Sequence, residues 1–170
     1  ALSFAYAYAT AFHEGIVLTI EEPESHLHPL AQRWLASRLL ELCRGGLQVV
    51  LTTHSSHFVN MLDVPGIVLV RKPPEGTTAR QLSTGELRAY CVAHGAPAAR
   101  ATEANILPFY DSNSTHELME GFFAKIVLLV EGPTESTALP VLLARTGLET
   151  SSLGIAVLSV TGKGNLAKWW

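Results

Sequence analysis

Several features that would narrow the function are scarce in, or missing from, this 170-residue sequence. Only two cysteines occur, Cys43 and Cys91, and they lie far apart in no metal-binding spacing, so we expect reduced thiols in a cytosolic protein. No apolar run approaches the ~20 residues that a membrane-spanning helix needs, so we expect no membrane partner. The net charge of −3 gives no overall attraction for nucleic acid, which would need a local patch, a further segment or metal ions.

The sequence also lacks an initiator methionine and the basic region of a signal peptide. Residues 2–13 are largely apolar and predict a helix that continues from an upstream part. We therefore expect an internal segment of a longer protein. Apolar residues make up 48% of the chain and charged residues 16%, which is enough apolar material for a sizeable core.

The first part of the chain alternates strand-like and helix-like segments. Three short apolar runs predict buried strands, at residues 16–20, 47–52 and 66–71. Between them we expect one helix at residues 30–43, which begins after Pro29 and ends at Gly45, and another at residues 57–62, which a preceding serine caps. This order is typical of an α/β fold with a parallel central sheet.

A weaker pattern follows before a second βαβ unit begins. Residues 72–112 predict a turn or hairpin tip, an edge strand and one short helix, and the stretch APAARATEANILPFYDSNS is expected to be mostly connector. The next segments predict a helix, a strand, a helix and a strand, at residues 115–125, 125–132, 136–146 and 154–160. We therefore predict three parts, which span residues 1–72, 73–113 and 114–170.

Acidic residues follow the first predicted strand directly. Glu21 and Glu22 are adjacent, and burying such a pair costs roughly several kcal/mol unless a cation lies beside it. Ligands of parallel sheets bind beyond the carboxyl ends of the strands, so one carboxylate is placed to hold Mg²⁺ and its neighbour to orient or deprotonate a water that attacks a phosphoryl group. Thr53 and His54 follow the second strand at the same edge, where a histidine can contact a γ-phosphate.

Other interpretations of these residues stay open. Glu21 and Glu22 could form a solvated strand end, and His54 could cap or pack against a helix. A zinc site is a further alternative, although no cysteine lies nearby. Its ligands would be His26, His28, His54 and His57.

The stretch IVLTIEEPESHLHP, followed by VVLTTHSSHF, resembles the Walker B strand, D-loop and switch histidine of ABC-type ATPases. The variant is the one found in RecF-like and OLD (overcoming lysogenization defect) proteins. The resemblance implies that Glu21 is the Mg²⁺-associated acid and that Glu22 is the catalytic glutamate. It also implies that Ser25 to His28 form a D-loop that crosses to a partner subunit, and that these residues and the switch histidine His54 belong to the ATP site of a homodimer.

A second acidic pair follows the strand predicted at residues 125–132. Glu131 stands at the strand end and Glu135 four residues later, and Gly132 lets a ligand approach the backbone closely. Thr134 is expected to cap the next helix, which places Glu135 in the first turn, where the helix dipole favours an anion. Two converging carboxylates suit Mg²⁺ or Mn²⁺, although a capping acid beside a surface acid would give the same pattern.

The stretches FFAKIVLLVEGPTE and GIAVLSVTGKGN resemble the opening of a Toprim domain, and their position after the ATPase-like part resembles the OLD family specifically. The resemblance implies an endonuclease that cleaves DNA, with Glu131 as metal ligand and candidate general base and Glu135 as metal ligand. Lys163, in a glycine-rich turn, would meet a phosphate or stay solvated. OLD-like proteins are linked with anti-phage defence and DNA repair, which enters here by analogy.

Three motifs of a complete enzyme are missing from the sequence. It has no G-x-x-x-x-G-K-[ST] phosphate loop, no signature resembling LSGGQ and no Asp-x-Asp after the second Toprim-like strand. We therefore predict that this chain alone neither hydrolyses ATP nor cleaves DNA efficiently. The leading hypothesis is a fragment of an ATP-linked, metal-dependent endonuclease, and the alternatives are an ATPase-linked Toprim sensor or binding module without nuclease activity, and a zinc hydrolase.

Overall fold

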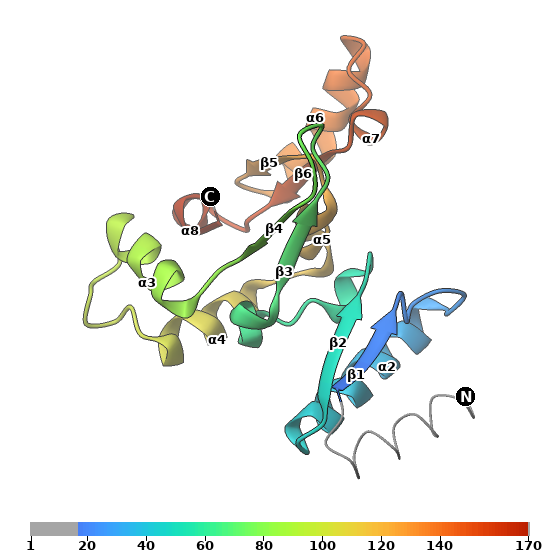
Figure 1. The fold of residues 1–170 in the computed structure, drawn as a ribbon. Coiled ribbons are helices and arrows are strands. Elements are labelled where there is room, and N and C mark those ends of the chain that lie inside the picture. The colour runs from blue at the N-terminus through green and yellow to red at the C-terminus, as the bar shows by residue number, and fades with distance from the viewer. Residues whose placement is uncertain (1–16, 170) are drawn as a thin grey trace. The chain divides into compact units, whose positions relative to one another are not determined.

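Residues 17–169 are described by a computed structural model, in which the chain has a mixed α/β fold and divides into two units between Phe58 and Val59 (Figure 1). The helix expected at residues 2–13 lies outside the described residues. No helix within the described range combines the length and the apolar character needed to cross a membrane.

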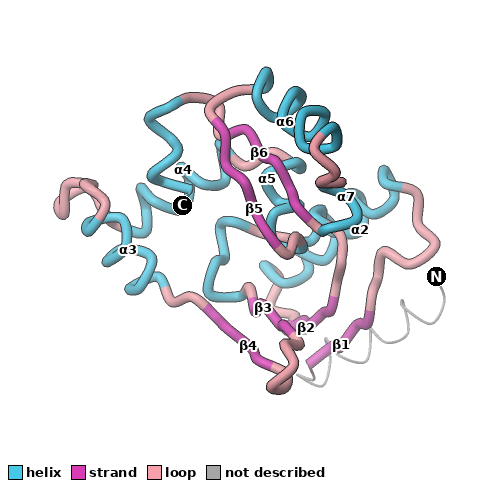
Figure 2. Tube along the Cα trace, turned by 90° about the horizontal axis from the view of Figure 1, so that it is seen from above, coloured by secondary structure: helices cyan, strands magenta, loops and turns pink. Residues whose placement is uncertain are grey.

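The first unit is a βαβ arrangement followed by a short 3₁₀ helix. Its elements are β1 (Val17–Glu21), α2 (Pro29–Arg44), β2 (Gln48–Thr52) and η1 (Ser56–Phe58). Figure 2 shows β1 and β2 side by side; they are parallel, with Val17 opposite Gln48 and Glu21 opposite Thr52. The two predicted strands and the helix between them are therefore confirmed, and both strands end at the same edge.

Local signals fix both ends of α2. Pro29 is its first residue, where a missing N–H costs nothing, and His28 Nδ1 accepts a hydrogen bond from the Leu30 N–H at 3.3 Å. The helix ends at Gly45, and Gly46 then adopts a φ of 99°, which favours glycine.

The prediction of a capped helix at residues 57–62 is wrong. Two 3₁₀ segments occur instead, η1 and η2 (Met61–Gly66). Asn60 interrupts the helical path because its side chain accepts a hydrogen bond from the Leu62 N–H at 3.1 Å while its backbone is extended. Within η2, Asp63 leaves the helical region and Pro65 lacks an N–H, so no α-helix can continue.

The third predicted strand does not join a parallel central sheet. β3 (Val68–Arg71) pairs antiparallel with β4 (Thr78–Gln81), and among residues 17–169 the strands form three separate two-stranded sheets. The connection between β3 and β4 is too short for the crossover that a parallel pair needs, so the chain folds back as a hairpin. The turn and edge strand expected in this region are confirmed.

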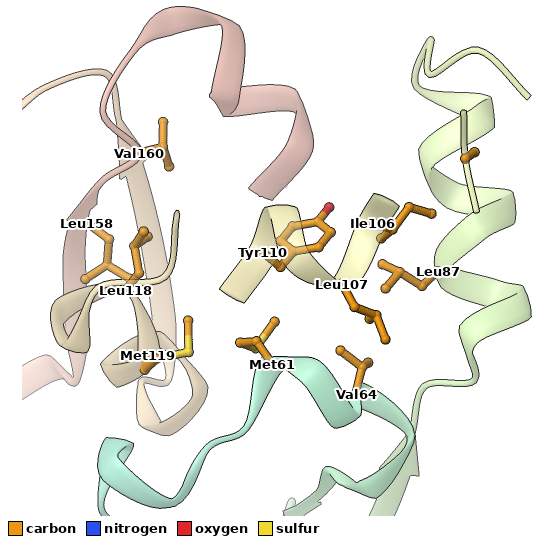
Figure 3. Packing of buried hydrophobic residues seen from close by; sticks show 11 residues of the cluster. Met61, Val64, Leu87, Ile106, Leu107, Tyr110, Leu118, Met119, Leu158 and Val160 are labelled. Carbon is orange, nitrogen blue, oxygen red and sulfur yellow. The ribbon is translucent and has the colours of Figure 1, made fainter. Parts of the chain in front are cut away.

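Much of the stretch expected to be a connector is helical and buried. After α3 (Thr84–Ala93) the chain forms α4 (Glu103–Asn113), which places Ile106, Leu107 and Tyr110 in the main core of the second unit. Figure 3 shows these side chains facing Leu87, Met61, Val64 and their neighbours. Burial of three large side chains outweighs the low helix propensity of Pro108, which obscured the helix in the sequence.

The end of the second unit is a further βαβ arrangement, as predicted. Its elements are α5 (His116–Glu120), η3 (Gly121–Phe123), β5 (Ile126–Val130), α6 (Pro133–Arg145), α7 (Thr150–Leu153), β6 (Ile155–Ser159), η4 (Lys163–Asn165) and α8 (Leu166–Trp169). β5 and β6 are parallel, with Val130 opposite Ser159 (Figure 2). The prediction that Thr134 caps this helix is wrong, because α6 begins earlier, with Gly132 as its N-cap and Pro133 as its first residue.

Candidate functional site

The backbone turns sharply where the first acidic pair follows β1. Glu21 ends the strand opposite Thr52, and the Glu22 N–H donates to the Thr52 carbonyl at 3.0 Å and lies 3.3 Å from the Thr52 hydroxyl. Glu22 has a φ of 43°, a conformation that costs roughly 1–3 kcal/mol in a residue with a side chain. The strand end is therefore held in a strained shape by its neighbour β2.

This turn brings Glu22, Ser25 and His54 together. Glu22 Oε1 lies 3.7 Å from His54 Nε2, and Glu22 Oε2 accepts a weak hydrogen bond from the Ser25 hydroxyl at 3.4 Å. The side chains of Glu22 and His54 are 49% and 82% exposed, so a ligand can reach both. The group combines an anionic oxygen, a hydroxyl and an imidazole at the carboxyl ends of two parallel strands.

One residue that the sequence analysis left without a role joins the same group. Glu24 Oε1 accepts the main-chain N–H of His54 at 2.6 Å, across 30 positions of sequence. Its other oxygen, Oε2, is buried and has no hydrogen-bond partner among residues 17–169. The only signal in the sequence was that a third glutamate stands in a short acidic string, which did not indicate a partner 30 residues away.

Among the described residues, the histidines of the zinc alternative do not gather into a metal site. His28 uses Nδ1 to cap α2, and His26 lies in the loop before it with a φ of 64°. Across the described part of the chain, no group of three or more His, Cys, Asp or Glu side chains is close enough to hold a metal ion. The geometry therefore gives the zinc alternative no support.

The second acidic pair lies where β5 ends. The Val160 N–H donates to the Val130 carbonyl at 3.0 Å, and the Gly162 N–H donates to the Glu131 carbonyl at 2.8 Å, so the turn after β6 is tied to the turn after β5. The Glu131 side chain is exposed beside this junction. Lys163, also exposed, begins η4 just beyond it.

Glu135 takes a structural role in this arrangement as well. It lies in the first turn of α6, as predicted, and its Oε2 accepts the Gly132 N–H at 3.1 Å, which caps the helix. Glu131 and Glu135 thus flank one short backbone turn, and the second oxygen of Glu135 is left for another contact.

Both acidic pairs have the chemistry that a hard divalent cation needs. Within residues 17–169 no lysine or arginine forms an ion pair with Glu21, Glu22, Glu131 or Glu135; the two recorded pairs join Arg38 to Glu41 and His54 to Glu22. Mg²⁺ is commonly held by one or two carboxylates together with waters and phosphate oxygens, so a cluster of three protein ligands is not required. The donor sets therefore fit Mg²⁺ or Mn²⁺.

Comparison with known families finds two separate matching segments. Residues 1–60 match the family described as AAA domain, putative AbiEii toxin, Type IV TA system. Residues 122–170 match the Toprim domain of overcoming lysogenization defect (OLD) protein-like sequences. The C-terminal segment therefore resembles OLD-like Toprim domains. The predicted resemblance to the OLD family is thereby confirmed.

A curated relative supports the same assignment for most of the chain. The Old nuclease of Escherichia phage P2 is 31% identical over 153 residues, which make up 89% of this chain and 24% of that protein. The chain therefore spans about a quarter of the length of this OLD relative, and the match extends over both acidic sites.

Proposed function

We propose that this chain is part of an ATP-hydrolysing, divalent-metal-dependent endonuclease of the OLD type. The observation that carries the proposal is the placement of Glu22 3.7 Å from His54 at the ends of two parallel strands, inside a segment that matches an ATPase family. The Toprim match over residues 122–170, with an acidic pair at the end of β5, supports the nuclease half.

In the ATPase half, each polar group has a distinct task. Glu21 holds Mg²⁺, which neutralises phosphate charge when bound. Glu22 orients the attacking water and accepts its proton, and His54 contacts the γ-phosphate. Ser25 to His28 reach toward the nucleotide of a second protomer, so the proposal includes a homodimer.

In the nuclease half, Glu131 and Glu135 hold Mg²⁺ or Mn²⁺, and Glu131 is also the candidate general base. The chain has a net charge of −3 and therefore does not attract the DNA backbone as a whole. A metal ion at this site would supply positive charge that binds a backbone phosphate. Lys163 directly follows Gly162, whose N–H donates to the Glu131 carbonyl, and in this proposal it contacts a phosphate. An ATP-dependent protein of this kind would work in the cytoplasm, in defence against phage or in DNA repair.

The two halves can be separated by one experiment on the intact protein that carries this segment. Glu22→Gln should lower the kcat of ATP hydrolysis by about 10²–10⁴-fold while ATP still binds, because the amide cannot accept a proton. Glu131→Ala should abolish nicking of supercoiled plasmid in Mg²⁺ or Mn²⁺ but leave ATP hydrolysis unchanged. Phosphate release and gel analysis of the plasmid measure the two activities.

The matched controls are Glu75→Gln and Glu75→Ala, since Glu75 is exposed in the β3–β4 turn. Both control variants should behave as the wild type. Plasmid nicking by Glu131→Ala at the wild-type rate would refute the Toprim assignment, and unchanged ATP hydrolysis by Glu22→Gln would refute the ATPase assignment.

One observation favours the alternative of a Toprim module that binds without cleaving. The Glu135 carboxylate already caps α6 through the Gly132 N–H, so one of its oxygens is engaged in holding the helix. A wild-type protein that hydrolyses ATP and binds DNA, yet leaves plasmid uncut in both metals, would establish this alternative.

A further inference from the structure

The loop after β1 and the loop after β2 are connected by a single carboxylate. Glu24 Oε1 lies 2.6 Å from the His54 main-chain nitrogen, which is the short distance typical of a hydrogen bond to a charged acceptor. The His54 imidazole, by contrast, is 82% exposed and lies 3.7 Å from Glu22, too far for a strong hydrogen bond. Of these two contacts, the main-chain bond is thus the firmer.

Neighbouring contacts hold the same two loops together. The Ser55 hydroxyl donates to Gln32 Oε1 at 2.8 Å, and Gln32 Nε2 donates to the Leu27 carbonyl at 2.9 Å. The residue after His54 is therefore tied, through α2, to the segment that begins at Glu24. Glu24 Oε2 stays buried without a partner among the described residues, which is an unfavourable state that the bond to His54 helps to offset.

We propose that Glu24 is a positioning residue for His54. Its carboxylate fixes the main chain at His54, so that the imidazole stays beside Glu22 rather than moving with the solvent-exposed loop. The proposal rests on the ATPase function proposed above, because its effect on turnover presumes that His54 contacts the nucleotide. Glu24 itself touches neither substrate nor metal in this account.

The kinetic test uses the intact protein. Glu24→Ala removes the acceptor and should lower the kcat of ATP hydrolysis roughly tenfold or more, with KM within about twofold of the wild type. Glu24→Gln keeps an oxygen acceptor and should recover most of this loss. In a His54→Ala background, Glu24→Ala should cause no further decrease, because the positioned side chain is already absent.

A second measurement does not depend on ATP. The His54 amide should exchange its hydrogen at least about tenfold faster in Glu24→Ala than in the wild type, as measured by amide exchange with residue-level resolution. Glu41→Ala, which removes an exposed carboxylate from α2, should change neither exchange nor turnover.

The outcomes separate the two proposals. Wild-type turnover and wild-type exchange in Glu24→Ala would overturn the positioning role, and so would an equal decrease in kcat with and without the His54 side chain. Absence of ATP hydrolysis in the wild-type intact protein would instead refute the proposed function, while faster His54 exchange in Glu24→Ala would still support the contact.

Discussion

Across residues 17–169, left-handed backbone in residues other than glycine is confined to the loops around the two acidic sites. Within the described residues, Glu22, His26 and Thr161 are the non-glycine positions with positive φ. Glu22 and His26 lie in the loop after β1, and Thr161 lies in the turn after β6. Such conformations cost roughly 1–3 kcal/mol each and persist where surrounding contacts impose them, which agrees with a functional use of both strand ends.

A glycine beside Thr161 allows a direct test of the second site. Gly162 has a φ of 129° and donates its N–H to the Glu131 carbonyl at 2.8 Å. Gly162→Ala should lower the free energy of unfolding by about 1–3 kcal/mol, because a Cβ strains this conformation even where space is open. It should also slow plasmid nicking by the intact protein, since the turn beside Glu131 shifts.

The matched control is Gly164→Ala in the same turn. A Cβ at Gly164 meets nothing within 4 Å, and its φ lies outside the range that glycine alone favours. Urea denaturation should place this variant within about 1 kcal/mol of the wild type. Equal destabilisation by both substitutions would contradict the conformational argument for Gly162.

Helix α3 begins with a capping box whose strength depends on pH. Ser83 Oγ accepts the Glu86 N–H at 3.2 Å, and Glu86 Oε2 accepts the Ser83 N–H at 2.8 Å and the Ser83 hydroxyl at 2.6 Å. The two hydrogen bonds that the Glu86 carboxylate accepts lower its pKa below the ordinary value of 4.5. The bond from the Ser83 hydroxyl has the largest effect, the bond from the Ser83 N–H comes next, and Arg80 adds a smaller effect.

A lowered pKa in the folded state means that Glu86 stabilises the fold above pH 4.5, and that this contribution is lost as the pH falls through the folded-state pKa. We therefore expect Glu86→Gln to be less stable than the wild type at pH 6, with the difference shrinking as the pH decreases to 3. Urea denaturation at several pH values measures this. Glu75→Gln is the control, and a difference that stays constant with pH would contradict the prediction.

The elements differ in how far the sequence could predict them. β1, α2 and β2 were predictable because Pro29, Gly45 and the apolar runs are local signals that act within a few residues. α4 was missed because Pro108 lowers its helix propensity, and only the burial of its apolar side chains against the rest of the core compensates. The turn or hairpin tip after β3 was predicted, but the third strand was expected in a parallel sheet, whereas β3 pairs antiparallel with β4.

Several large apolar side chains on the described strands and helices are exposed. Trp34 on α2 is 65% exposed and Val50 on β2 is 60% exposed, and β5 also exposes several apolar residues. Parallel strands are normally covered on both faces, and two-stranded sheets are marginal by themselves. Among residues 17–169, the elements that carry the two acidic sites therefore leave several apolar side chains uncovered.

The missing motifs lead to a prediction for the isolated chain. The purified 170-residue polypeptide should hydrolyse ATP and nick plasmid DNA at rates close to the buffer background, because its sequence contains no phosphate loop, no LSGGQ-like signature and no Asp-x-Asp. Phosphate release and plasmid nicking, compared with the intact protein at equal molar concentration, test this. Substantial ATP hydrolysis by the isolated chain would show that the prediction is wrong.

The sequence by itself determined where the acidic residues lie relative to the strands, because short apolar runs and the residues that end them are local features. It thereby placed Glu22 and Glu131 at strand ends, and it indicated the OLD family that the comparisons confirm. Only the tertiary structure decided that Glu24 binds the His54 main chain and that α4 is buried. Each of these depends on contacts between segments far apart in the chain or on burial by other elements, which no local pattern encodes.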